Sequence, residues 1–135
     1  MRWLLMNLAA GVVAFGALSN LYAQGPTLPD LEIITVEVRG DTAKVQVGNR
    51  GAADAGPCRL LMEIFQTDKK GDKRIDKMTV NVPALNARTK IWITLDGPLA
   101  LQGPGRKLRF EVNFARSVKE ASYENNVRWF PPMPK

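Results

Sequence analysis

The sequence predicts an all-β protein in which seven short antiparallel strands form a sandwich. Apolar and polar residues alternate with a period of two along several short segments, which is the pattern of strands with one buried face. Turn signals, such as those at 70–72 and 103–105, separate these segments. The only helix-like stretch, residues 115–121, is too brief to organise a helical fold. Short strands with turns at this spacing are typical of a sandwich and not of a parallel α/β sheet.

The clearest predicted strand covers residues 107–114. Apolar side chains at even positions (Leu108 to Phe114) alternate there with polar ones at odd positions (Lys107 to Asn113). One face of this strand should therefore be buried and the other solvated. The other six predicted strands cover residues 31–38, 42–48, 58–66, 75–82, 89–95 and 127–130.

Three local patterns predict the surroundings of single side chains. Cys58, the only cysteine, is in phase with the apolar residues of its strand, which predicts a buried structural thiol. Trp129 shares the phase of Val127 and is predicted to lie in the core. Ser117 and Glu120 have the spacing of a helix capping box.

The N-terminus has the three parts of a secretory signal: a positive start at Arg2, an apolar run over 4–18 and a small residue at Ala23. We therefore predict a signal peptide at 1–23, one domain at 24–130 and a proline-rich extended tail at 131–135. The apolar run is short for a membrane span of about 20 residues. An uncleaved anchor is the alternative. With the signal removed, the sequence predicts no stable membrane span and a periplasmic or secreted, cell-surface location.

Composition narrows the function classes. The net charge of +6 favours anionic envelope polymers, phospholipid headgroups or acidic proteins as partners. The chain has no histidine, which excludes imidazole acid–base catalysis and a Ser-His-Asp triad. It also lacks the basic helix or stacking platform of a nucleic-acid binder. Asp68, Asp72 and Asp76 lie among lysines without the dense oxygen spacing of a calcium loop, so no metal or cofactor is predicted.

Three segments, at 49–57, 79–87 and 120–126, resemble in order and spacing the CARDB family (cell adhesion related domain found in bacteria). The resemblance extends over 29–129. It implies an immunoglobulin-like β-sandwich that serves as a binding or spacer module in surface proteins, and it brings no catalytic residues. Arg88 stands where such domains usually carry glycine.

A candidate protein-binding face follows from the strand phases and the immunoglobulin-like strand order. With Cys58 and its in-phase neighbours inward, alternate side chains of 58–66 face outward, beside the 107–114 strand and the last strand. Apolar residues rimmed by arginine are typical of an interface. The predicted face consists of Arg59, Leu61, Phe65, Arg109, Arg128 and Phe130. Pairing at an unprotected edge strand is a second route to the same kind of partner, an envelope or surface protein.

Three alternatives stay open beside this non-catalytic, exported bacterial binding module. Trp92 is out of phase with its apolar neighbours and should be exposed on the opposite sheet, where it could stack on a glycan. Arg39, Gly40 and Asp41 form the tripeptide that integrin ligands display, although a tight turn prefers the same residues. An enzyme that uses two carboxylates would need a cleft holding both with perturbed pKa values.

Overall fold

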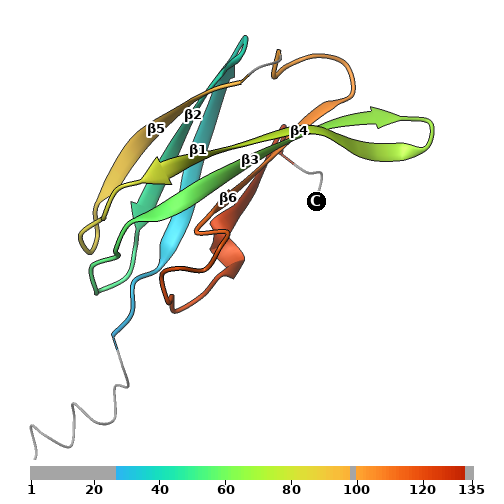
Figure 1. Ribbon diagram of the computed structural model, residues 1–135. Coiled ribbons are helices and arrows are strands. Elements are labelled where there is room, and N and C mark those ends of the chain that lie inside the picture. The colour runs from blue at the N-terminus through green and yellow to red at the C-terminus, as the bar shows by residue number, and fades with distance from the viewer. Residues whose placement is uncertain (1–26, 98–99, 133–135) are drawn as a thin grey trace, which may run out of the picture.

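Two antiparallel sheets packed face to face make up the fold, as the computed structural model shows for residues 27–97 and 100–132 (Figure 1). The three-stranded sheet has the order β1-β2-β5, and the four-stranded sheet has the order β4-β3-β6-β7. The strands are β1 (Leu31–Arg39), β2 (Thr42–Asn49), β3 (Cys58–Asp68), β4 (Gly71–Val82), β5 (Lys90–Asp96), β6 (Arg106–Val112) and β7 (Val127–Phe130). The predicted seven-stranded immunoglobulin-like sandwich is confirmed. The predicted signal peptide and the last three residues lie outside the described residues.

The β3–β4 hairpin is longer than predicted and projects beyond the rest of the sandwich (Figure 1). Its outer part has no apolar alternation, so the periodicity of the sequence ends before the ladder does. Cross-strand polar contacts hold this part instead: the Thr67 hydroxyl donates to the Asp72 carboxylate, which also pairs with Lys107. Gly71 turns the chain at a φ of 112°, a left-handed angle that glycine tolerates.

The core lies between the two inner faces. Leu60, Met62 and Ile64 from β3 are fully buried against residues such as Val45 and Leu95 of the other sheet. Cys58 continues the same row and is buried, as predicted. Burial raises the pKa of its thiol to about 11. The phase of β3 was therefore readable from the sequence.

The end of β6 differs from the prediction. The strand stops at Val112, and Asn113, predicted to face solvent, is 1% exposed with a left-handed φ of 55°. Its backbone N–H donates to the Arg59 carbonyl, and its side-chain amide donates to the Val118 carbonyl. Asparagine tolerates this backbone angle because its side chain bonds locally. The alternation therefore breaks one residue after Val112, which ends the regular β6 face.

Asn49 ties the first two family-like segments to each other. Its side-chain oxygen accepts from the Asp30 and Gly51 N–H groups, each at 3.1 Å. Its amide donates to the carbonyls of Ala53 at 2.8 Å and Leu85 at 3.2 Å. The bonds with Asp30 and Leu85 connect the loop at 49–57 to the segment before β1 and to the corner at 83–87, while those with Gly51 and Ala53 lie within the loop. This network accounts for asparagine at the end of β2.

Glu120 ties the third family-like segment to the same end of the sandwich. It is 5% exposed and accepts from the Leu31 N–H at 2.6 Å, the Asn113 amide at 2.8 Å and the Asn126 amide at 2.5 Å. The capping-box prediction is therefore wrong: residues 115–121 form no helix, and Glu120 bonds across the fold. A single helical turn, η1 (Glu124–Asn126), follows instead.

Candidate functional site

The outer face of the four-stranded sheet carries part of the predicted binding face. Leu61 and Phe65 of β3 point outward and are half-buried, while Arg59 is exposed and donates to the Thr79 hydroxyl. Leu61 lies between Thr79 of β4 and Glu111 of β6 in the ladder. The placement of these β3 side chains agrees with the prediction.

The last strand contributes different residues from those predicted. In the β6–β7 ladder, Trp129 lies opposite Arg109, whereas Phe130 lies opposite the buried Leu108 and Arg128 lies opposite the buried Phe110. Residues directly opposite each other share a face. Trp129 is therefore on the outer face, while Phe130 packs against the core and Arg128 is exposed on the inner side of an edge strand.

The sequence could not choose between these two phases of β7. Each alternative places one aromatic residue outward, Trp129 or Phe130, and four residues are too few for periodicity to decide. Only the pairing register with β6 settles the choice. Core placement of Trp129 was thus a wrong prediction with no local signal to correct it.

Phe65 and Trp129 form an aromatic pair across the sheet. Their ring centroids lie 5.6 Å apart with planes tilted by 42°, although β6 separates the two strands that carry them. This separation is within the range of favourable aromatic pairs. We call Leu61, Phe65, Val127 and Trp129 the aromatic face. These residues are half-buried on the outer sides of β3 and β7, and the charged Lys107, Arg109 and Glu111 of β6 lie between the two strands.

Ion pairs within the sheet lie between the residues of the aromatic face. Glu63 pairs with Arg74 of β4 and with Arg109 of β6, each at 3.0 Å, and Arg109 also pairs with Glu111 at 2.9 Å. The Glu63 side chain is only 12% exposed, so this network is partly desolvated. Arg109, predicted to offer its charge to a partner, is already engaged by two carboxylates of its own sheet.

The hairpin tip holds no candidate metal site. Asp72 bonds the Thr67 hydroxyl and pairs with Lys107 at 3.2 Å, and these contacts lower the pKa of its carboxyl. Asp68 accepts from the Lys70 N–H at 2.7 Å within the turn. Across 27–97 and 100–132, no three histidine, cysteine, aspartate or glutamate side chains are grouped to hold a metal ion.

The outer face of the three-stranded sheet exposes its aromatic residue, Trp92, more fully to solvent. Trp92, in the middle of β5, lies opposite Gln46 and is 48% exposed. The predicted exposure of Trp92 on the opposite sheet agrees with this placement. Two positions away on the same face, Lys90 lies opposite Gly48 at the rim of a hollow.

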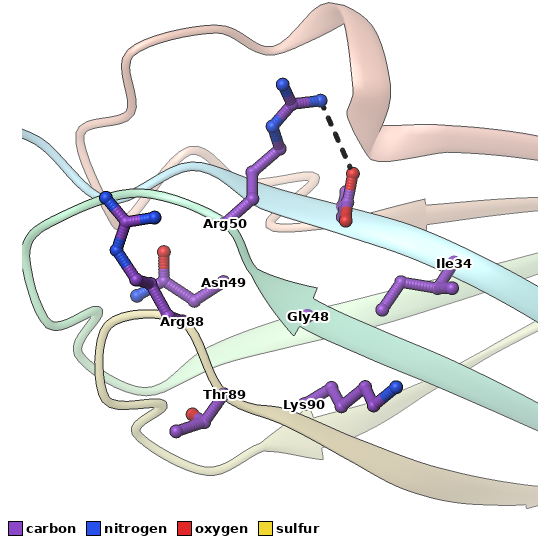
Figure 2. Close-up of a pocket in the computed structure, with 8 residues that line it drawn as sticks. Ile34, Gly48, Asn49, Arg50, Arg88, Thr89 and Lys90 are labelled. Carbon is purple, nitrogen blue, oxygen red and sulfur yellow. Dashed lines mark ion pairs between the residues drawn. The ribbon is translucent and has the colours of Figure 1, made fainter.

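This hollow has a volume of about 340 Å³. It lies at the end of the sandwich that Asn49 and Glu120 hold together, which we call the tied end. Figure 2 shows Gly48 between Ile34 and Lys90, with Arg50 and Arg88 on the neighbouring loops. Gly48 keeps the space open, because a Cβ there would come within 2.8 Å of the Ile34 side chain. Arg88 adopts a φ of 60°, a left-handed angle that glycine adopts more readily than other residues.

The tripeptide at Arg39, Gly40 and Asp41 forms the β1–β2 turn. Gly40 has a φ of 61°, and its carbonyl accepts from the Leu101 N–H at 2.9 Å. The Asp41 carbonyl accepts from the Gly97 N–H at 2.6 Å. The turn geometry and these backbone bonds account for the glycine and its neighbours structurally.

Solved structures with this architecture were found by structural comparison. A domain described as part of a cell surface protein from Methanosarcina acetivorans matches with a TM-score of 0.57 and 19% identity, over 74% of this chain and 86% of that one. The CARDB domain of a Pyrococcus furiosus protein, solved in complex with di-metal ions, matches with a TM-score of 0.52 and 22% identity, over 76% and 85%. The chain thus has a CARDB-like immunoglobulin-type fold, as the sequence resemblance implied.

Other comparisons set the limits of this assignment. No family model matches the chain, and no curated protein matches it. Among the residues that the structure describes, no helix is long and apolar enough to cross a membrane.

Proposed function

We propose that this domain is an exported, non-catalytic binding module of the bacterial cell envelope that recognises a protein partner through the aromatic face. The observation that carries this proposal is the half-buried Phe65–Trp129 pair on the outer face of the four-stranded sheet, next to charges that are paired within the sheet. Aromatic and arginine side chains are enriched in protein interfaces, whereas unpaired charges are rare at the interface centre.

The ion pairs lower the free-energy cost of removing water from this face. Because Arg109 is neutralised by Glu63 and Glu111, a partner that excludes water here would strand no lone charge. Arg59 at the rim remains exposed for charge complementarity, with its guanidinium bonded only to the Thr79 hydroxyl among the described contacts. The rim, not the centre, would then steer an acidic partner.

The envelope location draws on two separate supports. The N-terminal sequence has the pattern of a signal peptide. A domain of similar fold belongs to a protein described as a cell surface protein. Catalysis is not part of the proposal: Glu63 and Glu111 lie on a sheet face and share Arg109, whereas a carboxylate enzyme needs two such groups flanking a substrate cleft.

The test is crosslinking of the protein in intact cells of its source organism, followed by mass spectrometry. We expect one dominant envelope protein, captured by the natural chain and lost with Phe65→Glu or Leu61→Glu. Thr94→Glu, on the exposed outer face of the other sheet, is the matched control and should retain capture. Equal capture by all variants, or capture of no protein, would contradict recognition through the aromatic face.

Trp92 favours a second candidate function, a glycan-binding module. A half-exposed indole beside a hollow rimmed by Arg88 and Lys90 suits stacking on a sugar that carries an acidic group. Glycan-array binding that vanishes with Trp92→Ala and survives Leu61→Glu would support this candidate. The reverse pattern, with capture of a protein, would support the first.

A further inference from the structure

Polar side chains surround Trp92 on the outer face of the three-stranded sheet. The indole is 48% exposed in the middle of β5 and lies opposite Gln46 of β2. Thr94 is two positions further along the same face of β5 and is exposed. The Gln46 amide and the Thr94 hydroxyl therefore bring hydrogen-bonding groups to the surroundings of an exposed aromatic ring.

Two hollows flank Trp92 along the direction of the strands. The hollow at the tied end lies over Gly48, and a second hollow of about 330 Å³ lies between β1 and β2 near Thr42 and Lys44. In the register of β2 with β5, the level of Trp92 falls between Gly48 and Lys44. The six-residue step from Thr42 to Gly48 covers about 20 Å of a strand. We call Trp92 and the two hollows the Trp92 track.

The hollow at the tied end has an apolar floor and unpaired cations at its rim. The floor is the Ile34 side chain, which lies over Gly48 in the space that a Cβ there would occupy. Lys90 and Arg88 are exposed, and neither takes part in an ion pair among the described residues. Figure 2 shows the Lys90 side chain extended away from Thr89, with Arg88 on the loop before β5.

The two hollows together carry more cations than acids. The cationic side chains that line them are Arg39, Lys44, Arg50, Arg88 and Lys90, and the acidic ones are Glu32 and Glu37. Glu32 is already paired with Arg50 at 3.7 Å, whereas Glu37 lies opposite Lys44 without forming an ion pair. The excess of positive charge favours a ligand that carries acidic groups.

The arrangement of the Trp92 track suits a sugar chain better than a protein surface. Protein interfaces have at their centre a cluster of apolar anchors in desolvated pockets. Here one indole and the Ile34 side chain stand among polar and charged groups. A sugar ring has apolar C–H faces that stack on an aromatic ring and hydroxyl groups around its edge. A single sugar on Trp92 would leave at least one hollow unused, whereas a chain that continues in both directions would enter both.

From these observations we infer that the Trp92 track binds an acidic linear polysaccharide within its chain, with one sugar stacked on Trp92 and its neighbours in the two hollows. Arg88 and Lys90 pair with an acidic group at the tied end, and Lys44 does so at the other hollow. This inference rests on the second candidate function, glycan binding at Trp92, and adds the charge and the length of the ligand.

The probe is a series of linear oligogalacturonates of two, four and six sugars, titrated into the purified protein by calorimetry. We expect the hexamer to bind at least about tenfold more tightly than the dimer, because only a longer chain reaches both hollows at once. The methyl-esterified hexamer has the same rings without the charges and should bind about threefold or more weakly. Tighter binding of a chondroitin sulfate hexasaccharide than of the hexagalacturonate would assign sulfate as the preferred acidic group.

Four variants locate the site. Trp92→Ala should weaken every oligomer by about tenfold. Arg88→Gly at one hollow and Lys44→Gln at the other should each weaken the hexamer by about two- to fivefold. Glycine tolerates the φ of 60° at position 88, so this change should preserve the loop. Lys73→Gln, at an exposed position of β4 on the other sheet, is the matched control and should leave binding unchanged.

The outcomes separate this inference from the functions on which it builds. Equal affinity for the dimer and the hexamer, or an effect of only one of the two hollow variants, would overturn binding along the whole track but leave glycan recognition at Trp92 in place. Equal binding of the methyl-esterified hexamer would overturn the preference for acidic sugars. Failure of all these oligomers to bind, with Trp92-dependent binding on a glycan array, would overturn only this inference. Failure in both assays would overturn the glycan-binding candidate as well.

Discussion

The tied end of the sandwich and the open side between β5 and β4 are built in opposite ways. At the tied end, Asn49, Asn113 and Glu120 satisfy backbone groups of segments far apart in the chain. At the open side, no strand of the described chain pairs with the second side of β5, and Met78 and Val80 of β4 are only half-buried against the core. The segments that carry the family resemblance all belong to the tied end. Their side chains hold this end of the sandwich together, whereas the aromatic face lies on the outer side of the four-stranded sheet.

The largest expected effect comes from Glu120→Ala at the tied end. This change removes the acceptor of three buried hydrogen bonds and leaves the Leu31 N–H and two amides without it. We expect a loss of about 3–5 kcal/mol in the free energy of unfolding, measured by urea denaturation. Glu37→Ala, at an exposed position of β1, is the control and should change it by about 0.5 kcal/mol or less. Similar stability of the two variants would show that the tied end does not hold the fold.

Asn49→Asp should have the next largest effect. Aspartate keeps the acceptor for Asp30 and Gly51 but cannot donate to the carbonyls of Ala53 and Leu85. The Ala53 carbonyl loses its side-chain donor and the Leu85 carbonyl keeps only the Ala55 N–H, at a cost of about 2–3 kcal/mol in unfolding free energy. Faster amide exchange around Ala55 and Leu85, measured by NMR, would place the loss at this loop. A wild-type melting curve would contradict the role assigned to the amide.

Cys58, also at the tied end, predicts a pH dependence. Burial is the main cause that raises the pKa of its thiol from 9.0 to about 11, so the folded state holds the proton more tightly than the unfolded state. Stability from this group is complete below pH 9 and falls as the pH rises towards 11, by about 3 kcal/mol in total. Lysines titrate in the same range, so the measurement is the difference in slope between the natural chain and Cys58→Val. Identical slopes would show that the thiol is not buried in solution.

The smallest effect on stability is expected on the open three-stranded sheet. Trp92→Ala should change the free energy of unfolding by about 0.5 kcal/mol or less, because the side chain is 48% exposed. Trp129→Ala removes the contact with Phe65 and should cost about 1–2 kcal/mol. Thermal unfolding of both variants provides the comparison. A larger loss for Trp92 than for Trp129 would reverse the contrast between the two outer faces.

Prediction from the sequence succeeded where strands were long. The phase of β3 places Cys58 inward and Leu61 and Phe65 outward along residues 58–65, and the structure agrees. The prediction was wrong in β7, where four residues allow either Trp129 or Phe130 to face outward. It was also wrong at Asn113 and Glu120, because polar residues in a loop carry no periodicity that distinguishes a buried network from a solvated surface.

The sequence by itself determined the all-β class, the seven strands and the burial of Cys58, since each depends on alternation and turn chemistry within a short segment. Only the tertiary structure decided which side of β7 joins the aromatic face, that Arg109 is neutralised by its own sheet, and that β5 is an edge strand of its sheet. These features depend on the register and order of strands far apart in the chain. Local periodicity states which residues share a face, but it does not state what lies opposite that face.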